Sequence, residues 1–458
     1  MARNATAPHD PHYHCVGIGV GPANLSLASL LHGHRGMRKV FFEKEADFGW
    51  HEGQQIPGAS LQVSLFKDLV TLAEPTNPFS FLAYLHDQGK IYHFLNAQFD
   101  ALPRQEFRNY LRWASRRNPD IAFGEEVRSV GFDTEFVVRT NRRTVRAENL
   151  AVGVGTRPWL PPQATASART QFHVGDFVHR DGDLGGKRVC VVGGGQSGAE
   201  AVLDLLSRTG SRMPRRVTWV SRRANYFPID DSPFTNDFFM PCHSEHFFRQ
   251  DRPVREAFNR DMILSSDGIS ESTLREIYQQ LYVLRFVQGA TDRFALYPNR
   301  SVEAVAGTDA QGWELSLAHP DRPGRRELAD ADVVVWATGF RPADMSFLDP
   351  LADRLEREGE ELRVDDGYAV RWDGPSDRRI FVQNATRGQR GLADPNLSLN
   401  AYRSRRIADR LLGTRSDEQQ PSFIEWSAKT ASRVAAPAAT APAATAPATA
   451  AAEPSWAA

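Results

Sequence analysis

The chain has 458 residues, of which 55 are basic and 56 acidic, and 41% are hydrophobic. This composition is typical of a globular protein of about two or three domains, and the formal charge of −1 supplies no field for nucleic acid or an anionic membrane. Cys15, Cys190 and Cys242 form no CxxC pair, so we predict neither a thiol redox centre nor a thiolate metal site. No leader-like or long apolar run occurs, and we expect a cytoplasmic protein.

Both ends of the chain lack large apolar residues. Residues 1–12 are polar and contain prolines, and residues 434–458 are almost wholly Ala, Pro and Thr. Prolines at such intervals prevent a continuous helix, and the small side chains cannot build a core. We therefore expect disordered tails at 1–12 and 434–458.

The stretch HCVGIGVGPANLSLASLL, residues 14–31, has the pattern of a buried strand, a glycine turn and a helix. Gly19 and Gly21 match a dinucleotide-binding loop, and Asn24 takes the place of its third glycine. Glu43 ends the next predicted strand, where an acid accepts ribose hydroxyls and repels a 2′-phosphate. The pattern indicates FAD or NAD, with a surface glutamate that only closes the strand as the alternative interpretation of Glu43.

A second loop follows the apolar run RVCVVG at 188–193. It has a complete GxGxxG between a strand and a helix, made by Gly193, Gly195 and Gly198. The next predicted strand, at 216–221, ends without an acid, in Ser221, Arg222 and Arg223. Arginines suit a phosphate dianion, so this loop is expected to prefer NADPH over NADH; solvated surface arginines are the alternative. The two loops together predict a held flavin and a nicotinamide that reduces it.

Runs rich in Val and Ile alternate with helical stretches along the whole chain, a pattern typical of parallel strands covered by helices. We predict an α/β protein with two Rossmann-like domains, for FAD and NADPH. DVVVWATGF at 332–340 and the C-terminal segment look like a return to the first sheet. The expected domains are 13–165 plus 330–412 for FAD, 170–225 plus 290–329 for NADPH, and a small, mainly helical substrate region at 226–290.

Longer motifs carry a more specific signal than the loops. They are GIGVGPANLSLA, FGWHEG, LQVSLFKDLVTLAEPTNPFSFLAYL, PRQEFRNYLRWA, VVGGGQSGAE, WATGF and GLADPNLSLNAYRS. In this order they resemble the lysine and ornithine N-monooxygenases of hydroxamate siderophore biosynthesis, over about residues 13–412.

The resemblance implies an enzyme that uses FAD, NADPH and O₂ to hydroxylate the terminal amine of a small aliphatic substrate. In that cycle NADPH reduces FAD, O₂ adds at the flavin C4a position, and the neutral amine attacks the distal oxygen of the C4a-hydroperoxyflavin. Exclusion of water protects the oxygenated flavin from decay. The resemblance also implies a homo-oligomer, commonly a tetramer.

The resemblance assigns roles to individual residues as well. It places the flavin against Trp50, His51 and Gln62, and beside Asp394, Asn396 and Leu397. Four residues are implied in catalysis or substrate binding: Gln196 beside flavin and nicotinamide, Lys67 on the substrate carboxylate, and Asn236 and Ser398 near the substrate. Without the family, Trp50 could be a core aromatic, Lys67 a solvated residue and Asp394 a helix cap.

The substrate is expected to be L-lysine or a related diamine such as putrescine, cadaverine or diaminopropane. Ser266 stands where ornithine members have Asn, which leaves L-ornithine as the alternative. Lys67 favours a substrate with a carboxylate, and Arg390, where a His is usual, leaves the choice open. A second ammonium could instead meet acids such as Asp230, Asp231 and Asp267.

Other flavoprotein classes fit the sequence less well. A disulfide reductase needs a CxxC pair or an equivalent near the flavin, which this chain lacks. A Baeyer–Villiger or S-oxygenating enzyme is a second alternative, because the linker FHVGDFVH keeps Gly175 and His179 of a typical motif but shifts the aromatic residue to Phe172. A non-catalytic redox sensor would leave Lys67 without a role.

Overall fold

The structure, a computed structural model, describes residues 10–165, 167–180, 184–416 and 421–426. The expected tail at 434–458 and residues 1–9 lie outside this range. His12 does not belong to a tail, because it begins the first strand and pairs with Arg146. The chain up to Ile424 forms one unit, and every contact described below lies within it.

The first glycine loop follows a strand of a seven-stranded sheet, ordered β3-β2-β1-β6-β5-β4 with β19 also paired to β6. Strand β6 pairs in parallel with β1 along most of its length; on its other side, its carboxyl half pairs in parallel with β19 and its amino half pairs with the antiparallel β5. The bounds are β1 (His12–Ile18), β2 (Lys39–Glu43), β3 (Ile121–Phe123), β4 (Val127–Phe132), β5 (Phe136–Thr140), β6 (Thr144–Val152) and β19 (Arg379–Val382).

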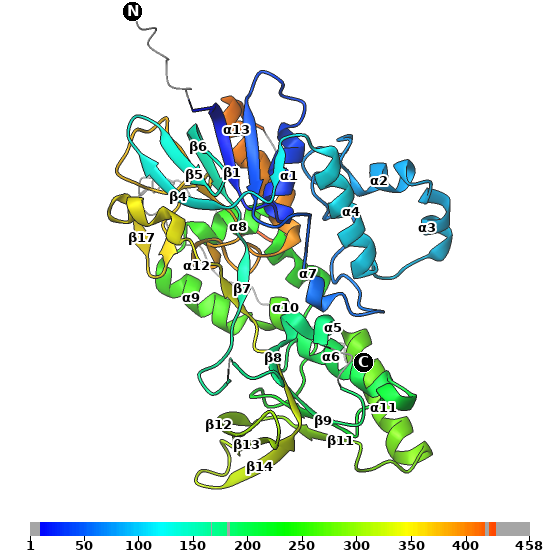
Figure 1. Ribbon diagram of the computed structural model, residues 1–458. Coiled ribbons are helices and arrows are strands. Elements are labelled where there is room, and N and C mark those ends of the chain that lie inside the picture. The colour runs from blue at the N-terminus through cyan, green and yellow to red at the C-terminus, as the bar shows by residue number, and fades with distance from the viewer. Residues whose placement is uncertain (1–9, 166, 181–183, 417–420, 427–458) are drawn as a thin grey trace, which may run out of the picture. The chain divides into compact units, whose positions relative to one another are not determined.

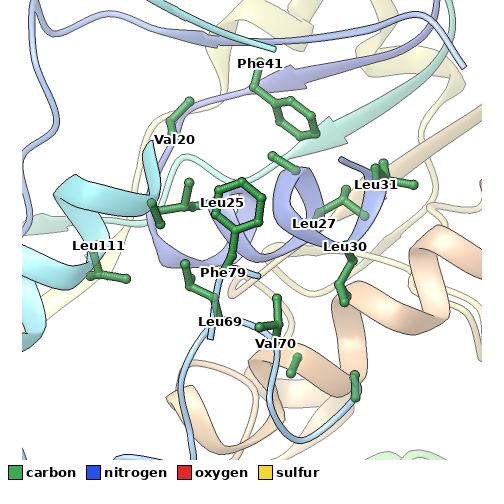
Figure 2. Packing of buried hydrophobic residues seen from close by; sticks show 14 of the residues in the cluster. Val20, Leu25, Leu27, Leu30, Leu31, Phe41, Leu69, Val70, Phe79 and Leu111 are labelled. Atoms are coloured by element: carbon green, nitrogen blue, oxygen red, sulfur yellow. The ribbon is translucent and has the colours of Figure 1, made fainter. Parts of the chain in front are cut away.

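Helix α1 (Pro22–Leu31) is buried along almost its whole length. It packs on the first sheet, on α13 (Asn400–Leu412) and on α4 (Arg104–Arg117). Figure 2 shows its leucines, among them Leu25 and Leu30, between Phe41 of β2 and the loop residues Leu69 and Phe79. The short helices α2 (Phe81–Asp87) and α3 (Ile91–Ala97) precede α4 in the chain.

The second glycine loop follows β9 in a five-stranded parallel sheet, ordered β11-β10-β9-β15-β8. Helix α6 (Gln196–Ser207) packs on β9 and β10, and an antiparallel three-stranded sheet adjoins β9 and β15 (Figure 1). The bounds are β8 (Gln171–His173), β9 (Arg188–Val192), β10 (Arg216–Val220), β11 (Phe294–Tyr297), β12 (Ser301–Thr308), β13 (Gly312–Ala318), β14 (Arg326–Ala331) and β15 (Val333–Trp336). Together the two sheets confirm the α/β class.

The expectation that 332–340 returns to the first sheet is wrong. Strand β15 pairs with β9 and β8 instead, and the Asp332 carboxylate binds Arg188 at the start of β9. The chain crosses back only afterwards, where β16 (Phe340–Pro342) pairs with β7 (Thr156–Pro158). The second segment of the first domain therefore begins near residue 340 rather than at 330, and β19 completes its sheet.

Helices fill the chain between β10 and β11. They are α7 (Pro233–Asn236), η5 (Asp237–Phe239), α8 (Pro241–Phe248), α9 (Arg252–Asp261), α10 (Leu264–Asp267), α11 (Glu271–Tyr282) and the π-helical η6 (Val283–Val287). The remaining short elements are η1 (Glu52–Gln54), η2 (Val174–Asp176), α5 (Phe177–Arg180), η4 (Gly210–Arg212), η7 (Ser346–Arg354), β17 (Arg357–Glu358), β18 (Glu361–Leu362), α12 (Arg387–Arg390) and η8 (Leu397–Leu399). Within the described ranges, none of the helices has the length and apolarity needed to cross a bilayer.

Candidate active site

The first glycine loop has the backbone geometry that a pyrophosphate needs. Gly19 has φ +81°, and a Cβ there would lie 2.8 Å from the carbonyl oxygen of Gly153. Gly21 is the N-cap of α1, with open space where a side chain would project. The free N–H groups of a helix N-terminus attract an anion, so these residues fit a nucleotide pyrophosphate.

Glu43 stands at the end of β2, beside this loop. Its Oε2 accepts a hydrogen bond from the Val20 N–H at 2.8 Å, and its Oε1 accepts one from the Glu45 N–H at 3.0 Å. The carboxylate therefore holds the turn in place. Each oxygen retains a second lone pair, which fits the ribose hydroxyls of an adenosine.

Asn24 supports the loop from inside the protein. Its fully buried amide donates to the carbonyl oxygens of Ile18, Gly19 and Ala151, and its oxygen accepts from Gln383. A Cβ on Gly153 would lie 2.7 Å from the Asn24 side chain. A third loop glycine would let the helix approach the strand closely. Here Gly153, on the facing segment, leaves the space for that approach instead.

The C-terminal motif is connected to Asn24 by buried polar groups. Gln383 also accepts a hydrogen bond from Arg403, which forms a fully buried ion pair with Asp394 at 3.2 Å. The second Asp394 oxygen accepts from the Thr386 N–H. Asp394 therefore shapes the motif through protein contacts and does not cap a helix.

The rest of this motif is held by a local turn. The Asn396 side-chain oxygen accepts from both the N–H and the hydroxyl of Ser398, at 2.9 and 2.7 Å. Ser398 is buried, whereas Asn396 and Leu397 are half-buried. Leu397 also packs against the core around α1. The turn thus fixes the side chains of Asn396, Leu397 and Ser398 relative to the first loop.

The second loop is closely packed against its own sheet. Gly193 has φ +143°, and Gly195 is the N-cap of α6. A Cβ on Gly198 would lie 2.5 Å from the Gly193 oxygen and 3.2 Å from the Cβ of Ala337. The three glycines therefore have the roles of turn, helix start and close contact that dinucleotide loops require.

The polar residues after β10 have separate environments. Ser221 is buried, and its hydroxyl accepts a hydrogen bond from the Arg223 N–H. The Arg223 guanidinium donates to the carbonyl oxygens of Gly194 and Asp267, and burial lowers its pKa. Arg222 is exposed and has no hydrogen bond or ion pair with the described residues. Of the two arginines, Arg222 is the one whose guanidinium is available for a phosphate.

Trp50 and His51 lie just before η1. The half-buried Trp50 ring packs edge-to-face on Phe107 of α4, with centroids 5.6 Å apart. His51 has φ 49°, and its side chain is exposed, with its ring edge-to-face to the rings of Trp50 and Phe340. Desolvation, together with the positive charge of Arg104, lowers the His51 pKa to about 4, so its imidazole is neutral at pH 7. Gln62 is exposed, and its amide has no hydrogen bond within the described ranges.

Lys67 is a half-buried lysine without a carboxylate partner among the described residues. Its Nζ lies 5.9 Å from the centroid of Phe239, and burial lowers its pKa. Phe239 follows Asn236 closely in the chain, so Lys67 lies near the segment that carries Asn236. Asn236 is exposed, and its amide donates to the main-chain carbonyl oxygen of Asp231 at 2.7 Å.

The acids considered for a second ammonium differ in availability. Asp230 caps the turn before α7 by accepting from Ser232 and Thr235, and Asp231 is exposed. Asp267 lies 3.5 Å from Arg387. Arg390 is buried between the rings of Phe248 and Tyr368 and takes a structural position. In the same region, Ser266 donates a hydrogen bond to the Asp267 carboxylate at 3.0 Å.

The sequence pattern of the L-lysine 6-monooxygenase/L-ornithine 5-monooxygenase family matches residues 11–342. The chain belongs to this family. It is 35% identical to the L-lysine N6-monooxygenase of Escherichia coli, over 91% of this chain and 98% of that protein. It is also 35% identical to the rhizobactin siderophore biosynthesis protein RhbE of Rhizobium meliloti, over 87% of this chain and 91% of that protein.

Solved structures of related enzymes share the fold. The cadaverine monooxygenase of desferrioxamine biosynthesis from Erwinia amylovora, bound to FAD, has a TM-score of 0.86 and 26% identity, covering 92% of this chain and all of that one. The ornithine N-hydroxylase of Kutzneria sp. 744, with reduced FAD, NADP⁺ and L-ornithine, has a TM-score of 0.81 and 29% identity, covering 88% and 99%. This protein is thus a flavin-dependent N-hydroxylating monooxygenase that uses FAD and NADPH.

Arg104 and Glu200 of this monooxygenase were not singled out from the sequence. Arg104, the first residue of α4, forms a two-pronged ion pair with Glu200 of α6, with N···O distances of 2.6 and 2.8 Å. Gln196, at the start of α6, donates to the same carboxylate at 2.9 Å. The only local signal was the i,i+4 spacing of Gln196 and Glu200, since Arg104 lies far away in the chain.

Proposed function

We propose that this enzyme hydroxylates the side-chain amine of L-lysine for hydroxamate siderophore biosynthesis. The balanced reaction takes the amine, O₂, NADPH and a proton to the hydroxylamine, NADP⁺ and water. Bound FAD, once reduced, supplies the oxygen-transferring group. The L-lysine N6-monooxygenase of Escherichia coli, at 35% identity over 91% of this chain, supports this substrate.

The environment of Lys67 is the observation that favours an amino acid as the substrate. The half-buried Lys67 ammonium has no carboxylate partner among the described residues, so its burial carries a desolvation cost that a substrate carboxylate would offset. The Phe239 ring near Nζ keeps the ammonium in place without neutralising it. Lys67 would then bind the α-carboxylate, so that the far amine of a lysine-length substrate points away from it.

The two cofactors fit separate sets of residues. Gly19, Gly21 and the Glu43 carboxylate would hold FAD, with Trp50 and the neutral His51 beside it. A second set, formed by Gly193, Gly195, Gly198 and Arg222, would hold NADPH. The open N-terminus of α1 supports the first assignment, and Arg222, which pairs with no residue in the described ranges, supports the second.

The amine must lose its proton before it can react, because only the neutral nitrogen has a free lone pair. An alkylamine has a pKa of about 10.4 in water, so the site must favour the uncharged form. Transfer of the amine from water into the site would contribute to this, because desolvation disfavours the charged form of an amine. Asn236 and Ser398 would orient the substrate chain.

A diamine is the second candidate substrate. The cadaverine monooxygenase of Erwinia amylovora is similar in fold, with a TM-score of 0.86, and putrescine N-hydroxylases are 28% and 26% identical to this chain. Asp231 is exposed and could meet the second ammonium of such a substrate. L-Ornithine would need the same Lys67 contact with a shorter chain.

The test compares substrates in the full-length, FAD-loaded enzyme with NADPH and O₂. L-Lysine should give the most hydroxylated product among L-lysine, L-ornithine, cadaverine, putrescine and diaminopropane. Lys67→Ala should raise the KM for L-lysine about 10- to 100-fold, the effect of losing a charged hydrogen bond, and change the KM for cadaverine little.

Lys90→Ala is the matched control, since Lys90 also lies over an aromatic ring but already binds Glu106. It should leave both KM values unchanged. Equal effects of Lys67→Ala on L-lysine and cadaverine would show that Lys67 does not bind a carboxylate, and a preference for cadaverine would favour the diamine. The tetramer stays a prediction from the resemblance, and the cytoplasmic location stays a prediction from the sequence pattern.

A further inference from the structure

The Glu200 carboxylate lies between Gln196 and Arg104. Its side chain is 5% exposed, and that of Arg104 is 13% exposed. Glu200 Oε1 accepts from the Gln196 amide at 2.9 Å and from Arg104 at 2.6 Å. Glu200 Oε2 accepts a further hydrogen bond from Arg104 at 2.8 Å. These three residues form what we call the Gln196–Glu200–Arg104 chain.

This arrangement allows only one orientation of the Gln196 amide. Its oxygen accepts a hydrogen bond from the Ser270 N–H at 2.8 Å, and its NH₂ group faces the Glu200 carboxylate. A flipped amide would place its oxygen against a carboxylate and its NH₂ group against an N–H donor, and both contacts would be repulsive. Glu200 therefore selects which end of the amide faces which neighbour.

Arg104 connects this helix to the segment that carries Trp50, His51 and Gln62. The guanidinium also donates to the carbonyl oxygens of Gln54 and Ser60, at 3.1 and 3.3 Å. A parallel contact joins the Gln54 amide to the Ser197 hydroxyl at 2.9 Å. The first turn of α6 is thus tied at two points to the segment before α4.

A buried ion pair is an inefficient way to add stability, because desolvation offsets much of the attraction. Such a pair does specify geometry, since each partner is left uncompensated if the two elements shift. Here the shared carboxylate also orients Gln196. The pair therefore couples the rotamer of one amide to the relative placement of the two nucleotide-binding domains.

We propose that Glu200 is a positioning residue for N-hydroxylation, which holds the Gln196 amide in register with the flavin-side segment through Arg104. This inference rests on the proposed function, because it takes Gln196 to lie beside the two cofactors. Misplacement of Gln196 would let O₂ be reduced without reaching the amine. The expected defect is therefore a lower yield of hydroxylated product per NADPH consumed, which we call the coupling, rather than a loss of substrate affinity.

Glu200→Gln in the full-length, FAD-loaded enzyme tests this. The variant keeps the side-chain shape but removes the charge, so the contacts of residue 200 with Gln196 and Arg104 weaken, while the hydrogen bond from the Ser270 N–H to Gln196 stays. Hydroxylated product per NADPH consumed should fall about 10-fold, with H₂O₂ making up the difference, while the KM for L-lysine stays unchanged. FAD content and melting temperature, measured alongside, report whether the variant folds.

The double variant Arg104→Met/Glu200→Leu separates positioning from stability. Apolar replacement of both charges should recover most of the melting temperature lost in Glu200→Gln, but the coupling should stay low. If the ion pair were purely structural, the double variant would recover both the melting temperature and the coupling. Asp120→Asn is the control, because it breaks the pair with the buried Lys39 at the opposite end of β2 from Glu43, and it should leave the coupling unchanged.

Wild-type coupling in Glu200→Gln, or its recovery in the double variant, would overturn the inference. Failure of the proposed function would look different, since the wild-type enzyme itself would hydroxylate no amine. In that case we would titrate the wild type and both variants with NADP⁺ and record the visible difference spectrum of the bound flavin. The inference requires that Glu200→Gln change this spectrum relative to the wild type and that Asp120→Asn leave it unchanged.

Discussion

Asn24 shows how one residue can replace a glycine in a dinucleotide loop. The sequence places it where a glycine would let the helix approach the strand. In the structure its amide binds three carbonyl oxygens of the loop and of β6, and the space comes from Gly153 on the facing segment. In the structure, Asn24 therefore supports the loop from behind.

Asn24→Ala should lower the free energy of unfolding by about 2 kcal/mol, because it leaves buried polar groups, including that of Gln383, without a partner. Flavin release should occur at lower urea concentration, which the recovery of flavin fluorescence measures. Asn96→Ala is the control, since Asn96 is exposed on α3. Similar curves for the two variants would contradict the supporting role.

At the scale of elements, the start of α6 is determined by how closely it can approach β9. Gly198 has the backbone oxygen of Gly193 on one side and the Ala337 side chain on the other. Any side chain at this position must push the helix away from its sheet. Because Gln196 and Gly195 lie on the same first turn, such a shift would displace the second loop as well.

Gly198→Ala should therefore raise the KM for NADPH and destabilise the fold by about 1–3 kcal/mol, the usual cost of overpacking. Its FAD content should not change, because the first loop lies on another sheet. Steady-state kinetics with varied NADPH and thermal unfolding measure the two effects. Gly36→Ala, at an exposed position with nothing within 4 Å of the added Cβ, serves as the control. An unchanged KM for NADPH would mean that the loop tolerates the shift.

For the molecule as a whole, His243 predicts how stability depends on pH. It is 4% exposed on α8, where it packs near Phe238, Phe247 and Phe258 and shares a hydrogen bond with the Phe238 oxygen. Burial, opposed by the Phe238 and Asp237 interactions and assisted by His246, lowers its pKa from 6.5 to about 4. Folding thus keeps this imidazole neutral, and the unfolded chain binds the proton more readily.

Stability should therefore be complete above pH 6.5 and fall as the pH decreases toward 4, by up to about 3 kcal/mol from this group. Urea unfolding between pH 4 and 8 measures the slope. His243→Asn keeps a donor for the Phe238 oxygen without a titrating ring, and it should flatten the profile over this range. His86→Asn, at an exposed position, is the control. An unchanged slope in His243→Asn would assign the acid sensitivity to other groups.

The parts of the site that depend on short, contiguous motifs could be predicted from the sequence. Both glycine loops and the acid after β2 were recognised, because turn geometry and helix starts are determined by residues a few positions apart. The partner of a strand is not local information. The run at 333–336 has the same apolar pattern for either sheet. Only its pairing with β9, together with the contact of the preceding Asp332 with Arg188, assigns it to the second sheet.

The same distinction applies to the chemistry. The sequence shows that Lys67, Gln196, Glu200 and Arg104 are present, together with the motifs of an N-hydroxylating monooxygenase. Only the tertiary structure leaves Lys67 without a carboxylate partner among the described residues. It also places Glu200 between Gln196 and Arg104, although Arg104 and Glu200 are 96 positions apart along the chain. The reason is physical: a motif reports the conformation of its own backbone, whereas burial and charge pairing depend on which distant segments the fold brings together.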